Sequence, residues 1–345
     1  MNMFGKRKIN MKIKFYSMKQ KFNKNLRWGV QAFFVLFSIY IWYRLYLFVR
    51  HFDTGGATPF VPRPESIDAF MPVGALVALK HLIVNRAVDV THPAALVLFL
   101  AALTVSFLFR RGFCGWICPV GALSEFIGKT GERLFGRNFS LPRFLDVSLR
   151  AVKYLLLLFF IKLVLIDMSP QAVAAFLQSP YYKIVDAKLL DFWIRPGRNT
   201  ILFLSAMVLL SLVVRNFWCR YLCPYGALLG VLGSLGVTSV KRDESRCTSC
   251  RLCTKGCPGG IEVHTKNSVR TPECIGCLSC VDVCPRGALS VSAGSFKLEK
   301  TVFAALLLGV FFAFVAVAKL TGHWESGVTY REYAYYLPIR DMISH

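Results

Sequence analysis

The sequence predicts an all-α polytopic membrane protein, with about five transmembrane helices and a small α+β insert rich in cysteine. Charged residues make up only 18% of the 345 residues, against roughly 25% in soluble domains. Uncharged apolar runs recur along the chain, and eight of the twelve cysteines lie within residues 247–284. Because 55% of the residues are hydrophobic, a disordered chain is excluded.

Four apolar runs approach the roughly 20 residues that a helix needs to cross a bilayer. The first carries one charge, Arg44, and the other three carry none. These four predicted spans are Trp28–Val49, Val90–Phe109, Asn199–Val214 and Thr301–Ala318.

Two further runs are less clear. Val147–Ile166 carries Arg150, Lys153 and Lys162, and we expect the first two side chains to extend to the membrane interface. Tyr221–Val240 is uncharged but contains Cys223-Pro224 and several glycines. It is either a sixth span or a short helix that leads into a strand at 237–240.

The distribution of Lys and Arg favours five spans. With five spans, 28 of these residues lie on the side of the N-terminus and 11 on the other, whereas six spans give 21 against 18. Loops rich in Lys and Arg stay in the cytoplasm. We therefore expect a bacterial inner-membrane protein with a cytoplasmic N-terminus and a periplasmic C-terminus.

This topology divides the chain into five parts. They are a basic cytoplasmic tail (1–27), a membrane region (28–240), the insert (241–298), a last span (299–318) and an outer tail (319–345). The tail of residues 1–27 has nine basic and no acidic residues, which suits contact with anionic membrane lipid. Nucleic-acid binding is the alternative, but the net charge of +23 largely follows the topology, so we expect no nucleic-acid partner.

Two cysteine runs identify the insert. The pattern Cys-x2-Cys-x2-Cys-x3-Cys-Pro occurs twice, 27 residues apart. Bacterial ferredoxins with two 4Fe–4S clusters use this run, and the fourth cysteine of each run binds the other cluster. Crossed ligation assigns cluster I to Cys247, Cys250, Cys253 and Cys284, and cluster II to Cys274, Cys277, Cys280 and Cys257. Two zinc sites are the alternative, whereas disulfides are disfavoured in the reducing cytoplasm.

The other four cysteines form two Cys-x3-Cys-Pro motifs, each directly after a predicted span. They are Cys114 with Cys118, and Cys219 with Cys223. The motifs belong to an internal repeat, in which Trp116 corresponds to Tyr221 and Pro-x-Gly-Ala-Leu follows in both. The proline favours a helix start at the second cysteine, where the helix N-terminus stabilises a thiolate. Four thiolates could bind a third Fe–S cluster; redox-active dithiols and purely structural cysteines are the alternatives.

Other cofactors are not expected. None of the six histidines lies well inside a clear span, so we expect no haem, and no phosphate loop or dinucleotide fingerprint suggests a nucleotide. Polar residues on the outer side, namely His51, Asp53, Asp89 and His92, could form a quinone site, but we interpret them as surface-loop polarity. The tyrosines of the outer tail, Tyr330, Tyr333, Tyr335 and Tyr336, are typical of an interfacial belt, with docking of an external redox partner as the alternative.

Together these motifs resemble a known family. The run Gly112-Phe-Cys-Gly-Trp-Ile-Cys-Pro-Val-Gly-Ala-Leu123, the second Cys-x3-Cys-Pro motif and the double ferredoxin run are similar to those of the NapH/MauN-type membrane polyferredoxins. These are 4Fe–4S quinol dehydrogenase membrane subunits related to the C-terminal half of NosR. The similarity extends from about residue 60 onwards, with Met71 where relatives often have cysteine and without the flavin-binding outer domain of NosR, so no flavin is expected.

The resemblance implies a function without assigning a catalytic residue. It implies an electron-transfer subunit that moves electrons between the quinone pool and a redox partner protein. The alternative that it implies is a maturation, assembly or regulatory factor for a respiratory metalloenzyme, using the same clusters.

Overall fold

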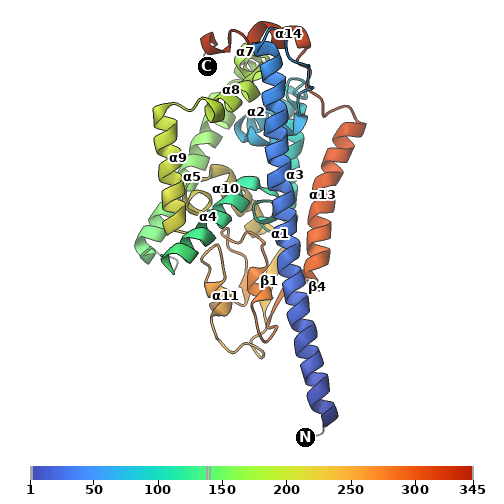
Figure 1. Ribbon diagram of the computed structural model, residues 1–345, viewed down its shortest axis with the longest axis vertical. Helices are drawn as coiled ribbons and strands as arrows, with labels where there is room; N and C mark the ends of the chain where they lie inside the picture. Colours follow the sequence, from blue (N-terminus) through green and yellow to red (C-terminus); the bar gives the residue numbers. More distant parts are fainter. Residues whose placement is uncertain (1–2, 137–138, 140, 344–345) are drawn as a thin grey trace. The chain divides into compact units, whose positions relative to one another are not determined.

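The computed structural model describes residues 3–136, 139 and 141–343, with side chains from residue 25 onwards. The side chains of the basic tail up to residue 24, and with them its predicted lipid contact, lie outside the described residues. The fold is mostly helical (Figure 1). Its elements are α1 (Met3–Asp53), η1 (Glu65–Phe70), α2 (Pro72–Asn85), α3 (Pro93–Leu108), η2 (Phe113–Ile117), α4 (Pro119–Phe135), α5 (Arg143–Ile161), η3 (Lys162–Asp167), α6 (Pro170–Gln178), α7 (Pro180–Lys183), α8 (Val185–Ile194), α9 (Arg198–Val213), η4 (Trp218–Leu222), α10 (Pro224–Leu235), β1 (Thr238–Arg242), α11 (Leu252–Lys255), η5 (Val263–Thr265), β2 (Ser268–Val269), α12 (Ser279–Asp282), β3 (Leu289–Ala293), β4 (Phe296–Leu298), α13 (Lys300–Leu320), α14 (Tyr330–Tyr336) and η6 (Arg340–Met342).

The chain forms two compact units, each described here by itself. The first unit comprises residues 1–35, 105–125 and 229–308, and it contains the cysteine-rich insert. The second comprises residues 36–104, 126–228 and 309–345.

Among the described residues, two helices are long and apolar enough to cross a membrane, namely Asn25–Asp53 of α1 and α13. A third candidate is the bent pair of α8 and α9, whose axes differ by 74°. The helix α3 is apolar but has only 16 residues. These findings indicate a membrane protein with two or three candidate spans, so the count of five and the orientation stay predictions.

The ambiguous run from Tyr221 to Val240 forms three successive elements. It begins in the π-helical turn η4, continues as the 12-residue helix α10 and ends in strand β1. The short helix leading into a strand is therefore the alternative that the structure adopts. Glycines permit this path: a Cβ at Gly236 would lie 1.9 Å from the carbonyl oxygen of Phe107.

Helix α5 differs from the sequence expectation at its lysine. The side chain of Lys153 is buried, with 1% of the residue exposed, and its ammonium lies 5.0 Å from the ring centre of Tyr154. The expectation that Lys153 extends to an interface is therefore wrong, because its side chain is buried within the protein. Arg150, by contrast, forms an ion pair with Asp146 one helical turn earlier.

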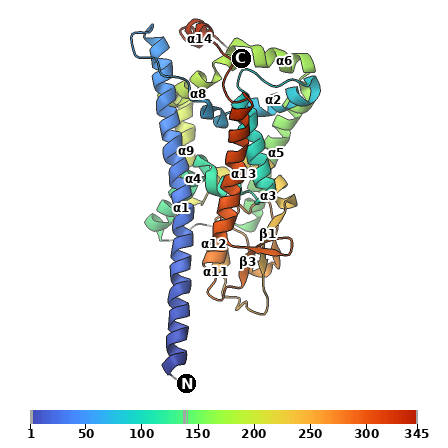
Figure 2. The ribbon, with the colours of Figure 1, turned by 90° about the vertical axis from the view of Figure 1, so that its right-hand side faces the viewer.

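The insert folds around a four-stranded antiparallel sheet of order β2-β1-β3-β4. Val240 of β1 is paired with Val291 of β3 and with Val269 of β2, so these three valines lie side by side on one face of the sheet. The short helices α11 and α12 lie near this sheet (Figure 2). The sheet begins at Thr238, slightly before the predicted start of the insert at residue 241.

Candidate metal centre

The first of two small cavities in the insert is lined by Cys247, Cys250, Cys253 and Cys284. These are the four cysteines that crossed ligation assigns to cluster I. The backbone N–H of Ala288 donates to the Sγ of Cys284 at 3.3 Å. Contacts with Ser249 and Arg242 lower the pKa of Cys247, so the surroundings of Cys247 favour its thiolate form.

The second cavity is lined by Cys257, Cys274, Cys277 and Cys280, the set assigned to cluster II. Its surroundings are apolar and include Val240, Ile261 and Val269. Burial raises the pKa of Cys257 to about 12 and holds that of Cys280 well above its usual value, and neighbouring thiols add to both effects. Four thiolates held this close together repel one another. Iron bound to all four would remove this repulsion, and cysteine thiolates are the usual ligands of iron–sulfur clusters.

The loops that hold the cysteines have the same backbone in both halves. Positive φ angles occur at Ser249 and Arg251 in the first run, and at Gly276 and Leu278, 27 positions later, in the second. Because left-handed backbone is uncommon for residues other than glycine, its repetition indicates a shape that the loop requires. A loop that curls in this way brings its first three cysteines towards one centre.

A buried arginine supports an anionic group at cluster II. Arg110, only 2% exposed, donates to the carbonyl oxygens of Gly233 at 2.7 Å and Thr271 at 3.2 Å. Its Nε is buried with no hydrogen-bond partner, and among the described residues no carboxylate pairs with it. The guanidinium opposes the burial-induced rise in the pKa of Cys274. A buried charge needs a counter-charge, and a thiolate-ligated cluster would supply it, so the residues present fit an iron–sulfur cluster.

The first Cys-x3-Cys-Pro motif packs directly against the cluster II loop. Trp116 is fully buried, and its indole N–H donates to the carbonyl oxygen of Gly276 at 2.9 Å. A Cβ at Gly115 would lie only 2.2 Å from the carbonyl oxygen of Ile275, so only glycine permits this approach. Arg27 of α1 fixes the segment from its other side by donating to the carbonyl oxygen of Gly115 at 2.9 Å and pairing with Glu125.

Both motifs share a local structure that the spacing alone did not reveal. Each forms a π-helical turn, in which the N–H of Cys118 donates to the carbonyl oxygen of Phe113 at 2.9 Å and that of Cys223 to Trp218 at 3.0 Å. The proline after each second cysteine begins an α-helix, α4 or α10. The prediction of a helix start at the second cysteine is confirmed.

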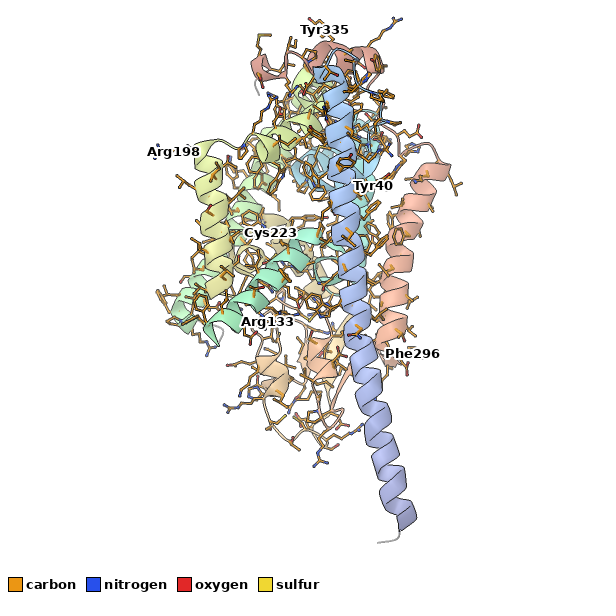
Figure 3. All side chains as sticks on the ribbon, in the orientation of Figure 1. Tyr40, Arg133, Arg198, Cys223, Phe296 and Tyr335 are labelled. Carbon is orange, nitrogen blue, oxygen red and sulfur yellow. The ribbon has the colours of Figure 1, made fainter. Side chains whose placement is uncertain are left out.

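The second motif uses different partners. The hydroxyl of Tyr221, at the position corresponding to Trp116, donates to Asp146 of α5 at 2.6 Å. Arg220 pairs with the same carboxylate at 2.7 Å. The N–H of Gly226 donates to the Sγ of Cys223 at 3.2 Å, so the start of α10 (Figure 3) stabilises negative charge on this sulfur.

The two motifs belong to different units: Cys114 and Cys118 lie in the first, and Cys219 and Cys223 in the second. The structure therefore describes each pair separately, and a third cluster shared by all four cysteines stays a prediction. Within the first unit, the Nε of Arg111 lies 3.3 Å from the Sγ of Cys114, which places a cation beside this sulfur.

The polar residues predicted as surface polarity in the second unit are largely buried. Asp89 is 2% exposed, His51 7% and His92 fully buried, so the surface interpretation is wrong for these three. Asp89 and His92 were missed because periodicity carries no information on burial in loops, and His51 because α1 continues to Asp53, beyond the predicted end of the span at Val49. Asp53 is exposed and pairs with Arg340 at 2.5 Å.

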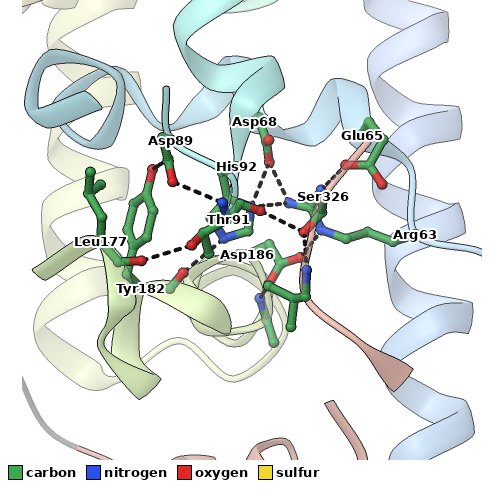
Figure 4. Close-up of polar contacts among 12 residues, drawn as sticks. Arg63, Glu65, Asp68, Asp89, Thr91, His92, Leu177, Tyr182, Asp186 and Ser326 are labelled. Carbon is green, nitrogen blue, oxygen red and sulfur yellow. Dashed lines mark hydrogen bonds and ion pairs between the residues drawn. The ribbon is translucent and has the colours of Figure 1, made fainter. Parts of the chain in front are cut away.

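Arg63 is the centre of this buried network (Figure 4). Its guanidinium donates to Asp186 at 2.6 Å, to Glu65 at 2.5 Å and to Asp68, and it lies 3.1 Å from the Nδ1 of His92. Burial raises the pKa of Glu65 to about 7; Asp68 and Asp186 add to the effect, and Arg63 opposes it. The Glu65 carboxyl is therefore more readily protonated than an ordinary glutamate side chain.

Arg63 and Glu65 also line a cavity of about 810 Å³. Several aromatic side chains line it, among them Phe48, Phe60 and Tyr330, and His51 lies 2.9 Å from the hydroxyl of Tyr330. Of the tail tyrosines, Tyr333 is buried in a core cluster with Phe48 and Phe52, whereas Tyr330 is 52% and Tyr335 67% exposed. The interfacial belt stays a prediction.

Comparison with protein families supports the iron–sulfur assignment. A family of 4Fe-4S binding domains matches residues 91–142 and 199–242, each of which contains one Cys-x3-Cys-Pro motif. A family of 4Fe-4S dicluster domains matches residues 239–285, where the double ferredoxin run lies.

Several bacterial proteins are similar over long stretches. YccM of Escherichia coli, whose name proposes an electron-transport role, is 39% identical over 92% of this chain and 91% of its own length. The ferredoxin-type protein NapH of Escherichia coli is 26% identical over 58% of this chain and 70% of its own length. The regulatory protein NosR of Stutzerimonas stutzeri is 28% identical over 55% of this chain, but over only 26% of its own length. No solved structure gives a significant match.

Proposed function

Since this chain belongs to the family of NapH- and NosR-like membrane polyferredoxins that includes YccM, we propose that it moves electrons between the membrane quinone pool and a redox partner protein. Its iron–sulfur electron-transfer character follows from the relatives and the matched 4Fe-4S families. The quinone link, the partner and the number of clusters are the proposed part.

One observation carries the proposal: the two cavities are lined by the two crossed sets of four cysteines. A 4Fe–4S cluster bound at such a site supplies reversible one-electron chemistry. The protein excludes water from the Cys277 and Cys280 side of the insert and leaves Cys250 accessible. Arg110 places positive charge beside Cys274, which favours an anionic cofactor there.

Contact between the insert and a membrane-adjacent segment supports the quinone link. Trp116 and Gly115 hold the Cys114–Cys118 turn against the loop of Ile275 and Gly276. Oxidation of one quinol to quinone releases two electrons and two protons, and two clusters that take one electron each balance the electrons. A soluble ferredoxin would need no such attachment to η2, so this packing favours exchange with a carrier in the membrane.

Anaerobic purification followed by iron and sulfide analysis tests the cofactors. We expect about eight iron and eight sulfide per chain for two clusters, or about twelve of each for three. Zinc without iron would contradict the proposal. Crossed ligation further predicts that Cys284→Ser and Cys250→Ser alter the same cluster signal in electron paramagnetic resonance, whereas Cys257→Ser alters the other.

Proteoliposomes test the quinone link. Addition of a quinol should reduce the clusters, or reduced clusters should reduce a quinone, at a rate that depends on the quinone content of the membrane. The alternative role, maturation or assembly of a respiratory metalloenzyme, uses the same clusters and is favoured if dithionite reduces them but neither quinone reaction occurs.

A further inference from the structure

The two halves of the insert allow an internal comparison. Positions 27 residues apart share left-handed backbone at Ser249 and Gly276, at Arg251 and Leu278, and at Gly260 and Gly287. The short helices α11 and α12 begin directly after the second of these pairs. Most residues that line the cluster I cavity therefore have a counterpart, 27 positions away, that lines the cluster II cavity.

The side chains around the two cavities differ systematically in charge. Arg246, Arg251 and Arg286 line the cluster I cavity, and we call these three residues the arginine rim. Their counterparts are Glu273, Leu278 and Gly259, which line the cluster II cavity. Because the same loop forms with an acidic, an apolar and a small residue at these positions, the loop itself does not require the arginines.

The arginine rim is also open to solvent. All three side chains are exposed, as is Cys250 between two of them. Among the described residues no carboxylate forms an ion pair with Arg251 or Arg286, whereas Arg246 lies close enough to Asp243 to lower the pKa of that carboxyl. Arg242, the fourth arginine of the cavity, is only partly exposed and already bonds to Asn267 at 2.9 Å and Glu244 at 3.2 Å.

Cluster II is covered by the protein itself. The α-carbon of Gly276 packs so closely that an added Cβ would lie 2.8 Å from the carbonyl oxygen of Phe109, and Trp116 donates to its carbonyl. The lining of the cluster I cavity includes no described residue from 105–125 or from α13. Cluster I is therefore the centre that a soluble protein can approach.

We infer that the arginine rim docks an acidic soluble electron carrier, with carboxylates around its redox centre, over cluster I. Positive charge around an exposed redox site attracts such a carrier and orients its centre towards Cys250. An anionic lipid surface would also bind arginines, but it needs no access to a cluster, and these arginines surround one. The inference rests on the proposed electron-transfer function, because it names the kind of partner that receives or delivers the electrons.

The test measures binding separately from electron transfer. The full chain is placed in nanodiscs of neutral phosphatidylcholine, and its Kd for a purified acidic flavodoxin is measured at low and high salt. The variant R246Q/R251Q/R286Q removes the arginine rim. The variant K241Q/R270Q/K297Q removes the same charge from exposed positions of the insert that line neither cavity, and iron content is checked in both variants.

We expect removal of the arginine rim to raise the Kd about tenfold or more at low salt. The Kd should also depend less on salt, because the charge attraction that salt screens has been removed. The control should change the Kd by less than about twofold. Equal effects of the two variants, or an unchanged Kd in both, would overturn the inference; the unchanged value is also what a lipid-binding role predicts. A wild-type chain that binds flavodoxin through the rim but exchanges no electrons would instead refute the proposed function.

Discussion

Arg110 offers the sharpest test of the cluster II site. Replacing Arg110 by Met removes a buried positive charge that lies beside Cys274. An added electron on the cluster is stabilised by this charge, so its loss should lower the midpoint potential. For a separation on the order of 8 Å and an effective dielectric constant of about 20, Coulomb's law gives about 2 kcal/mol. For a one-electron couple this corresponds to a decrease of roughly 90 mV.

A redox titration followed by electron paramagnetic resonance measures this change. One of the two midpoint potentials should fall, and the other should move little, because the charge is local. Arg110→Lys is the matched control: it keeps the charge but loses the paired bonds to the carbonyls of Gly233 and Thr271, so the potential should largely be retained while stability falls by about 1–3 kcal/mol. An unchanged or higher potential in Arg110→Met would refute the reasoning.

Three further predictions concern other residues. Gly115→Ala should destabilise the iron-loaded protein by about 1–3 kcal/mol, because the added methyl group overpacks against the carbonyl of Ile275. The control Gly309→Ala, with no atom near its added Cβ, should be neutral or stabilising. Equal thermal-unfolding temperatures for the two variants would contradict the close packing of Gly115 against Ile275. Glu65 has a folded pKa of about 7, above the usual value, so its contribution to stability is complete below about pH 4.5 and is lost as pH rises to about 7, on the order of 3 kcal/mol. Between about pH 5 and pH 8, the unfolding temperature of Glu65→Gln should therefore fall less than that of the wild type. Equal decreases in the two proteins would show that Glu65 does not cause this pH dependence. If the Cys-x3-Cys-Pro motifs bind a third cluster, replacing both Cys219 and Cys223 by Ser should lower the iron content from about twelve to about eight per chain, whereas an unchanged content would rule it out.

The cysteine sets were predictable from the sequence because short loops fix their own geometry. A run with two residues between successive cysteines can place three sulfurs around one centre, and the fourth follows from the crossed pattern. The cavities contain the same sets. The helix starts at Pro119 and Pro224 were equally accessible, since proline suits the first turn of a helix. These features depend on neighbours in the chain.

Long-range contacts were not predictable in this way. Nothing local to Trp116 indicates that its indole donates to Gly276, 160 positions later. Asp89 and His92 resemble polar loop residues in the sequence, and only the approach of Arg63 and Tyr182 from separate segments buries them. The number of membrane spans does not follow from composition for a related reason: α3 and α9 have only 16 residues each, and apolar composition does not fix where a helix begins and ends.

The two internal repeats show how one local structure serves different contacts. Trp116 and Tyr221 occupy corresponding positions in identical π-helical turns, yet one donates to the insert and the other to α5. In the insert, Arg251 and Leu278 share the same left-handed backbone, yet one is exposed and the other is 3% exposed. The backbone at each pair is set by the repeat, so the difference in side chain reflects what each copy faces. On this reasoning the second run is adapted to contact the rest of the chain, and the first run to contact another molecule.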